Sequence, residues 1–208
     1  MKLTSTDFVN MGRLDARYAL CAPDEASHAR FSDNRNPALV WSAPPSGTRS
    51  LVLICVDPDV PTKPDDVNQE GRVVPASLPR CNFYHWVMVD IAPEVRSIAG
   101  GSCSSGVIAH GKKQPPGPPG SRQGINDYSG WFAGDAAMGG LYFGYDGPCP
   151  PWNDERLHHY HFVLYATSLA RCPVEGAFTG TQVEAAITGR ALAEARLTGT
   201  YSLNPAVK

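Results

Sequence analysis

The sequence predicts a mostly β domain with one helix near its C-terminus. Glycine and proline account for 20 and 19 of the 208 residues. They separate short apolar runs, as is typical of all-β folds. Three of these runs are almost continuously apolar instead of alternating with polar residues. Strands of that kind are usually covered on both faces, so we expect a central sheet between two layers.

The three apolar runs give the expected central strands, at residues 51–56, 85–91 and 160–166. The helix is expected to begin at the sequence Thr181-Gln182-Val183-Glu184, which has the pattern of a capping box. Apolar residues follow at roughly helical spacing as far as Leu192, although Gly189 interrupts them. Alternation over residues 195–203 then predicts a closing strand.

The segment from Gly101 to Gly140 is expected to be a long loop. Its proline-rich run at residues 112–120 can form neither a helix nor a sheet ladder, and loops of this length are usually functional or mobile. The aromatic residues Tyr128, Trp131 and Phe132 follow this run. They are too apolar to stay fully in water, so we expect them to pack over a pocket mouth or across a homodimer interface.

Composition limits the classes of partner and the compartment. The net charge is −2 and the basic residues are scattered, which gives no reason to expect nucleic-acid binding. No apolar stretch is long enough to span a membrane, and charged residues interrupt the N-terminus before a signal-peptide core develops. The six cysteines form no CxxC pair. We therefore expect a single domain over residues 1–208, a cytoplasmic location and six free thiols.

Polar residues at the ends of the expected strands predict one shared site. Side chains two residues apart in a strand share a face. Asp57 is then expected on the same face of its strand as Asp59, and His158 on the same face as Tyr160. His85 is expected on the face of Val87 and Val89.

A cavity lined by these groups and by amides of the glycine-rich loop 144–151 would suit an anion such as phosphate or carboxylate. Imidazole, phenol and backbone amide groups can all donate hydrogen bonds to it. If an imidazolium is the donor, binding should weaken as the pH rises through the histidine range. The aspartates are expected to orient a histidine tautomer or to hold loop amides, with an ammonium head group as a further partner.

Simpler interpretations exist for each feature. The sequence Asp-Pro-Asp-x-Pro is by itself more often a turn that ends a strand, and His85 alone is more often an ordinary strand-end histidine. A metal ion would have to be held by Asp57, His85 and His158, because adjacent histidines of a strand face opposite sides. Cys149 has no sequence signature of a nucleophile. We predict no metal, no cofactor and no catalytic residue.

Four motifs, in this order, resemble the phosphatidylethanolamine-binding protein family, most closely its bacterial Raf-kinase-inhibitor-like branch. They are Asp57-Pro58-Asp59-Val60-Pro61, His85-Trp86, the loop 144–151 with the sequence GYDGPCPP, and His158-His159-Tyr160. The resemblance extends from about Phe31 to Tyr201. It implies a β-sandwich with a large antiparallel sheet, a C-terminal helix and a small anion pocket at one end of the sheet.

The resemblance also assigns the ligand-binding positions and shows two departures from the family pattern. The family commonly has His-Arg-Tyr at residues 158–160, so a salt bridge of that arginine is expected to be absent or replaced. The insertion at residues 127–135 is longer than in compact members and is expected to reshape the pocket mouth. The positions that match the family's ligand-binding residues are Asp57, Asp59, Pro61, His85, Pro148, Pro151, His158 and Tyr160.

The function expected from these observations is non-enzymatic binding of phosphate, a phosphomonoester or a phospholipid head group. Binding of this ligand is expected to regulate a protein partner, as in a kinase inhibitor. The alternative is a small hydrolase or lyase that uses Asp57, His85 and His158 as acid and base groups. No activated nucleophile or cofactor motif accompanies these three residues, which favours binding.

Overall fold

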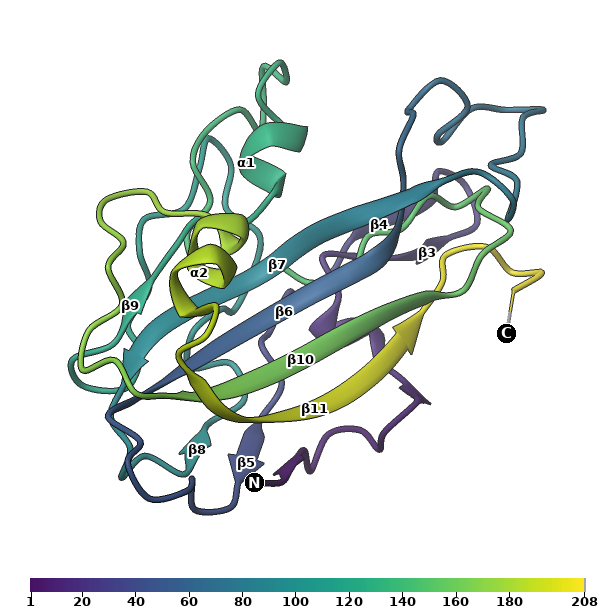
Figure 1. Cartoon of the computed structure of the whole chain (residues 1–208). Coiled ribbons are helices and arrows are strands. Elements are labelled where there is room, and N and C mark those ends of the chain that lie inside the picture. The colour runs from purple at the N-terminus through teal and green to yellow at the C-terminus, as the bar shows by residue number, and fades with distance from the viewer. Residues whose placement is uncertain (208) are drawn as a thin grey trace.

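The computed structural model describes residues 1–207 and has a large, strongly twisted sheet at its centre (Figure 1). The strand order is β2-β11-β10-β6-β7-β9, and every pairing is antiparallel except the short one between β11 and β2. These six strands are β2 (Gly12–Arg13), β6 (Ser50–Pro61), β7 (Arg80–Ile91), β9 (Arg122–Gln123), β10 (His158–Thr167) and β11 (Ala191–Tyr201).

Smaller elements cover the central sheet. A second sheet has the order β1-β5-β8, and a hairpin pairs β3 with β4. Two α-helices and one 3-10 helix complete the secondary structure of residues 1–207. The bounds are β1 (Leu3–Thr4), η1 (Ala16–Tyr18), β3 (Cys21–Asp24), β4 (His28–Phe31), β5 (Leu39–Trp41), β8 (Ser97–Ile98), α1 (Tyr128–Trp131) and α2 (Gly180–Ile187).

Both faces of the central sheet are buried, as the continuous apolar runs predicted. In β6, Leu51, Leu53 and Cys55 pack into one core, together with apolar residues of β1, β5 and β8. Val52 and Ile54 point the other way, into a second core that α2 covers (Figure 1). The alternation of side chains along one strand thus supplies both layers. The mostly β sandwich with a large sheet and a C-terminal helix is confirmed.

The helix begins and ends earlier than the sequence suggested. Its N-cap is Thr179, whose side chain accepts a hydrogen bond from the backbone N–H of Gln182, while the Gln182 side chain reaches back to the Thr179 backbone N–H. This capping box lies two residues before the predicted one. Helix α2 ends at Ile187, and Gly189 follows with a φ of 71°. That backbone angle suits glycine and separates the helix from β11, which begins four residues before the predicted strand.

The expectation of six free thiols is wrong. Cys21, on β3, and Cys149, in the loop before β10, form a disulfide across a sequence separation of 128 residues. Cys55, Cys81, Cys103 and Cys172 are free. The spacing argument failed because the fold brings together two cysteines that are far apart in sequence. Disulfides persist mainly in oxidising compartments, so the thiol argument for a cytoplasmic location is also lost.

The disulfide makes a direct prediction for chemical labelling. Alkylation of the denatured but unreduced protein should add four adducts, because only four thiols are free. Reduction before alkylation should raise the number to six, since the chain has six cysteines. Mass spectrometry of the intact chain measures both numbers. Six adducts without reduction would show that the bridge does not form.

Candidate functional site

A cavity of about 410 Å³ opens at the end of the central sheet where β6, β7 and β10 meet. Its polar residues on these three strands are Asp57, His85, His158 and Tyr160, each no more than 3 % exposed. Most of the remaining wall is apolar. The wall comprises Phe31, Val60, Pro61, Pro64, Val67, Phe83, Tyr128, Trp131, Phe132, Pro150, Pro151 and the disulfide Cys21–Cys149, with Thr62, Asn68 and Cys81.

Strand alternation positions three of the four polar side chains as predicted. Asp57 continues the face of Leu53 and Cys55 on β6. His158 and Tyr160 continue the face of Phe162 on β10. Since β10 pairs with β6 in antiparallel register, the beginning of β10 lies beside the end of β6. The two faces therefore meet in the cavity.

His85 reaches the cavity through a β-bulge and not through alternation. Val87 and Val89, which were expected on its face, lie in the opposite core. The pairing of β6 with β7 shifts between Cys55↔Trp86 and Val56↔Tyr84. This shift leaves His85 unpaired and turns it toward the cavity beside Tyr160. Bulges are a known means of redirecting a side chain next to a functional site.

One ring nitrogen of His85 is engaged by the glycine-rich loop. The Nδ1 atom lies 2.8 Å from the backbone carbonyl oxygen of Asp146. A carbonyl can only accept, so Nδ1 carries a hydrogen and neutral His85 has an unprotonated Nε2. Burial lowers the pKa of His85, although the charge of Asp57 opposes this effect. The imidazole is therefore neutral near pH 7.

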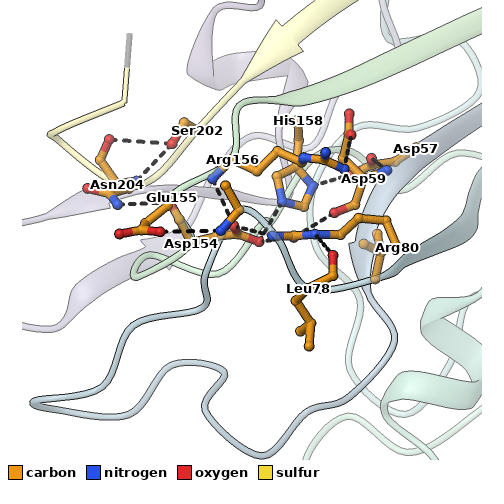
Figure 2. A network of polar contacts seen from close by, with 12 residues as sticks. Asp57, Asp59, Leu78, Arg80, Asp154, Glu155, Arg156, His158, Ser202 and Asn204 are labelled. Atoms are coloured by element: carbon orange, nitrogen blue, oxygen red, sulfur yellow. Dashed lines mark hydrogen bonds and ion pairs between the residues drawn. The ribbon is translucent and has the colours of Figure 1, made fainter.

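His158 is held between two carboxylates (Figure 2). Its Nδ1 lies 2.7 Å from Asp57 and its Nε2 lies 3.1 Å from Asp154, whose carboxylate also forms a buried ion pair with Arg80 at 2.5 Å. Burial opposes protonation of His158, but the two carboxylates outweigh it and raise its pKa to about 9. His158 is therefore a structural imidazolium, and both of its N–H groups already have acceptors.

Tyr160 provides a hydrogen-bond donor without a partner. Its hydroxyl is buried, and no group of residues 1–207 accepts a hydrogen bond from it in good geometry, although the Asp57 carboxylate lies nearby. The ring lies 5.1 Å from that of His85, centroid to centroid. Burial, aided by the charge of Asp57, raises the pKa of Tyr160 well above its ordinary value, so the hydroxyl keeps its proton. A buried polar group of this kind normally has an acceptor, so a ligand oxygen is expected to supply one.

Three further predicted positions have different surroundings. Pro61 and Pro151 line the cavity. Pro148 does not, and its carbonyl accepts hydrogen bonds from the backbone N–H groups of Leu20 and Cys21. This contact fixes the loop against the segment that carries the disulfide.

Asp59 also lies outside the cavity, because the pairing of β6 with β7 shifts between Asp57 and Val60. Its carboxylate contacts His159 Nδ1 at 2.8 Å and Arg156 at 3.3 Å. The family pattern has an arginine at residue 159, where this chain has His159. The salt bridge of that arginine is therefore replaced by the contacts of Asp59 with His159 and Arg156.

The loop 144–151 does not present the row of free amides that its glycines suggested. The backbone N–H of Gly144 donates to the carbonyl of Gly124, and that of Asp146 donates to the backbone carbonyl of His85. The N–H of Gly147 donates to the side-chain oxygen of Asn34. A Cβ atom on Gly147 would lie 2.1 Å from the carbonyl oxygen of Tyr18, so only glycine allows this approach. The loop amides thus hold the loop in place.

Sequence reasoning missed several residues that build the site. Arg80 and Asp154 complete the ion-pair chain behind His158. Asp154 stands four residues before His158, a separation that suggests a contact only if the chain turns there. The Asp146 side chain accepts hydrogen bonds from Asn34 and Asn126 and pairs with buried Lys112 at 2.8 Å. No sequence pattern links these residues.

The insertion at residues 127–135 covers the cavity. Helix α1 and the following residue place Tyr128, Trp131 and Phe132 in its wall. This is the first of the two placements expected for these aromatic residues. The side chains of Tyr128 and Phe132 stack at 5.4 Å, while Trp131 remains 51 % exposed. A homodimer interface stays a prediction.

Two kinds of structural feature are not found in residues 1–207. In this part of the chain no group of three or more histidine, cysteine, aspartate or glutamate side chains is arranged to bind a metal ion. None of its helices has the length and apolar character needed to cross a membrane.

A family model and several sequence relatives match this chain over almost its whole length. The family model described as phosphatidylethanolamine-binding protein matches residues 4–202. A UPF0098 protein of Methanothermobacter thermautotrophicus is 30 % identical over 201 residues, which cover 97 % of this chain and 98 % of the relative. The UPF0098 protein YbhB of Escherichia coli is 27 % identical, with coverage of 97 % and 100 %.

Solved structures support the same fold. The crystal structure of E. coli YbcL, described as a new member of the mammalian PEBP family, superposes with a TM-score of 0.68 at 23 % identity and covers 97 % of each chain. A putative phosphatidylethanolamine-binding protein homologue, CT736 of Chlamydia trachomatis, gives a TM-score of 0.63 at 25 % identity and covers 97 % of this chain and 96 % of its own. Because the family model spans almost the whole chain, this protein belongs to the phosphatidylethanolamine-binding protein family.

Proposed function

We propose that the protein is a non-enzymatic binding protein that holds a small anion in this cavity. The ligand would be phosphate, a phosphomonoester or a phospholipid head group, and its capture would regulate a protein partner. The observation that carries the proposal is the Tyr160 hydroxyl, a buried donor at the cavity with no acceptor among residues 1–207. A phosphate oxygen is a strong acceptor for such a group.

The surroundings of the reactive groups favour binding over catalysis. Cys149 is joined to Cys21 and has no free thiol. The free thiol of Cys81 also lies in the wall, but burial raises its pKa, so it is not a reactive thiolate near pH 7. His158 has both ring nitrogens on carboxylates, so it has no free nitrogen with which to accept a proton from a substrate. The hydrolase or lyase alternative would then depend on His85 as its base, because the Asp57 carboxylate already accepts hydrogen bonds from His158 and from the backbone N–H of Asp59. The nearby Tyr160 hydroxyl would be a weak general acid, because its pKa is raised well above the ordinary value, chiefly by burial.

A substitution that removes only the Tyr160 hydroxyl tests the binding proposal. Tyr160→Phe should weaken the binding of inorganic phosphate by about 10-fold or more, since a hydrogen bond to a charged group contributes about 1.5–3 kcal/mol. Isothermal titration calorimetry measures the affinity. Tyr165→Phe is the matched control, because Tyr165 lies on the same strand but packs against the opposite core.

Equal phosphate affinity of wild type and Tyr160→Phe would count against the proposed site. Release of phosphate from phenyl phosphate by the wild type, lost in His85→Ala, would instead support the enzymatic alternative. Both assays use the same purified protein.

A further inference from the structure

We propose that the cavity selects a phosphate group that retains a proton, so that inorganic phosphate or a phosphomonoester binds as its monoanion. In this arrangement the P–OH group donates to Nε2 of His85, while the Tyr160 hydroxyl donates to another phosphate oxygen. Dianions and phosphodiesters would be disfavoured. This inference rests on the proposed function and specifies which form of the anion the site accepts.

The first observation is that the four polar residues placed in the cavity by β6, β7 and β10 offer more acceptors than donors. Nδ1 of His85 donates to the carbonyl of Asp146, which leaves the lone pair of Nε2 as the free position on the ring. The Asp57 carboxylate also lines the cavity. Against these two acceptors stands one free side-chain donor among the four polar residues, the Tyr160 hydroxyl.

The second observation is that other donors nearby are already used. His158 directs both N–H groups to carboxylates. In the loop, the N–H groups of Gly144, Asp146 and Gly147 all have protein acceptors. Residues 148, 150 and 151 are prolines and have no N–H, so Cys149 is the one residue of 148–151 with an amide hydrogen. The amides of Tyr145 and Cys149 are therefore the most that the loop can offer to a phosphate, too few to surround a fully deprotonated one.

The third observation is the balance of charge. The protonated His158 and Arg80 are matched by Asp57 and Asp154, so this chain of four groups has no net charge. His85 itself is surrounded by aromatic rings at centroid distances of 5.0–5.5 Å, and these surroundings and burial keep it neutral. The polar and charged groups that face it are Asp57 from β6, Asp146 from the loop, His158 and Tyr160 from β10, and Tyr128 from α1.

These observations distinguish three forms of ligand. A dianion would place an oxygen lone pair against the lone pair of Nε2 and add a second charge close to Asp57. A diester carries one charge but has no P–OH group to donate. The monoanion of a monoester satisfies both Nε2 and Tyr160. Because a phosphomonoester loses its second proton at a pKa of about 6, binding above that pH must take one proton from the solution.

Calorimetry on the wild-type protein tests the inference with methyl phosphate and dimethyl phosphate between pH 6.5 and 8.5. The affinity for methyl phosphate should fall about 10-fold per pH unit, and titrations in two buffers of different ionisation enthalpy should show the uptake of one proton. At pH 6.5 dimethyl phosphate should bind at least 10-fold more weakly. Equal binding of the diester, or an affinity that does not change with pH, would overturn the inference but keep the proposed function. The absence of anion binding at any pH would contradict the proposed function itself.

Nitrogen NMR of the histidines tests the role of His85 directly and needs no variant. The free protein should show the tautomer with hydrogen on Nδ1. Saturation with methyl phosphate should shift the Nε2 signal toward its protonated position. His161, whose Nδ1 contacts Thr198 outside the cavity, is the internal control and should not move. Hydrogen on Nε2 in the free protein, or an unchanged Nε2 signal, would show that Nε2 of His85 does not accept a hydrogen bond from the P–OH group of the ligand.

Discussion

Asp154→Ala is expected to lower the free energy of unfolding by about 3–5 kcal/mol. The substitution removes the carboxylate that pairs with Arg80 at 2.5 Å and with His158 at 3.1 Å. Both partners are buried and would keep their charges without this acceptor. Urea unfolding at pH 7 measures the loss. Glu175→Ala is the control, because its side chain is 74 % exposed, and loss of its ion pairs with Arg171 and Arg122 should have little effect.

The same ion-pair chain predicts how stability depends on pH. The pKa of His158 is raised to about 9 from an ordinary value of 6.5. A group with a raised pKa stabilises the fold fully below the unfolded pKa, and the contribution is lost as the pH rises through the folded pKa. Wild-type stability should therefore fall between pH 6.5 and 9, by about 3 kcal/mol from this group. The fall should shrink in Asp154→Ala, whereas a wild-type stability that stays constant from pH 7 to 9 would contradict a protonated His158.

Hydrophobic pattern was sufficient to predict the sheet and most of the cavity's polar residues. Continuous apolar runs predicted strands buried on both faces, and alternation along β6 and β10 brought Asp57, His158 and Tyr160 together. These features depend on local spacing, which a single sequence displays. The strands were also longer than predicted at the site end, because polar residues continue the pairing beyond the apolar runs.

Features that depend on distant partners were not predictable in the same way. Bulges in β7 and β6 turned His85 toward the cavity and Asp59 away from it, since register shifts depend on both strands of a pair. The pairing of Cys21 with Cys149 depends on the folded path of the chain between them. The capping box was misplaced because Thr179 and Thr181 are both acceptable N-caps by sequence.

The surroundings of Lys112 differ most from what the neighbouring sequence predicts. Lys112 begins the proline-rich run at residues 112–120, which was expected to belong to a functional or mobile loop. In the structure Lys112 is only 6 % exposed, and its ammonium group contacts Asp146 at 2.8 Å and donates to the carbonyl of Tyr145. Burial lowers the pKa of Lys112, while Asp146 opposes that shift. The loop is therefore anchored beneath the candidate site.

Lys112→Met is consequently expected to destabilise the protein by about 3–5 kcal/mol, because it leaves the Asp146 carboxylate buried without its cation. Lys113→Met is the matched control, since Lys113 is adjacent but exposed and should change stability little. The double variant Lys112→Met, Asp146→Asn should recover part of the loss, which a double-mutant cycle in urea measures.

The same substitution should also weaken phosphate binding, because residue 146 supplies the carbonyl that fixes the His85 tautomer. If Lys112→Met is as stable as Lys113→Met, the hydrogen bonds from Asn34 and Asn126 must be sufficient to satisfy the Asp146 carboxylate. The ion pair would then not be what anchors this loop.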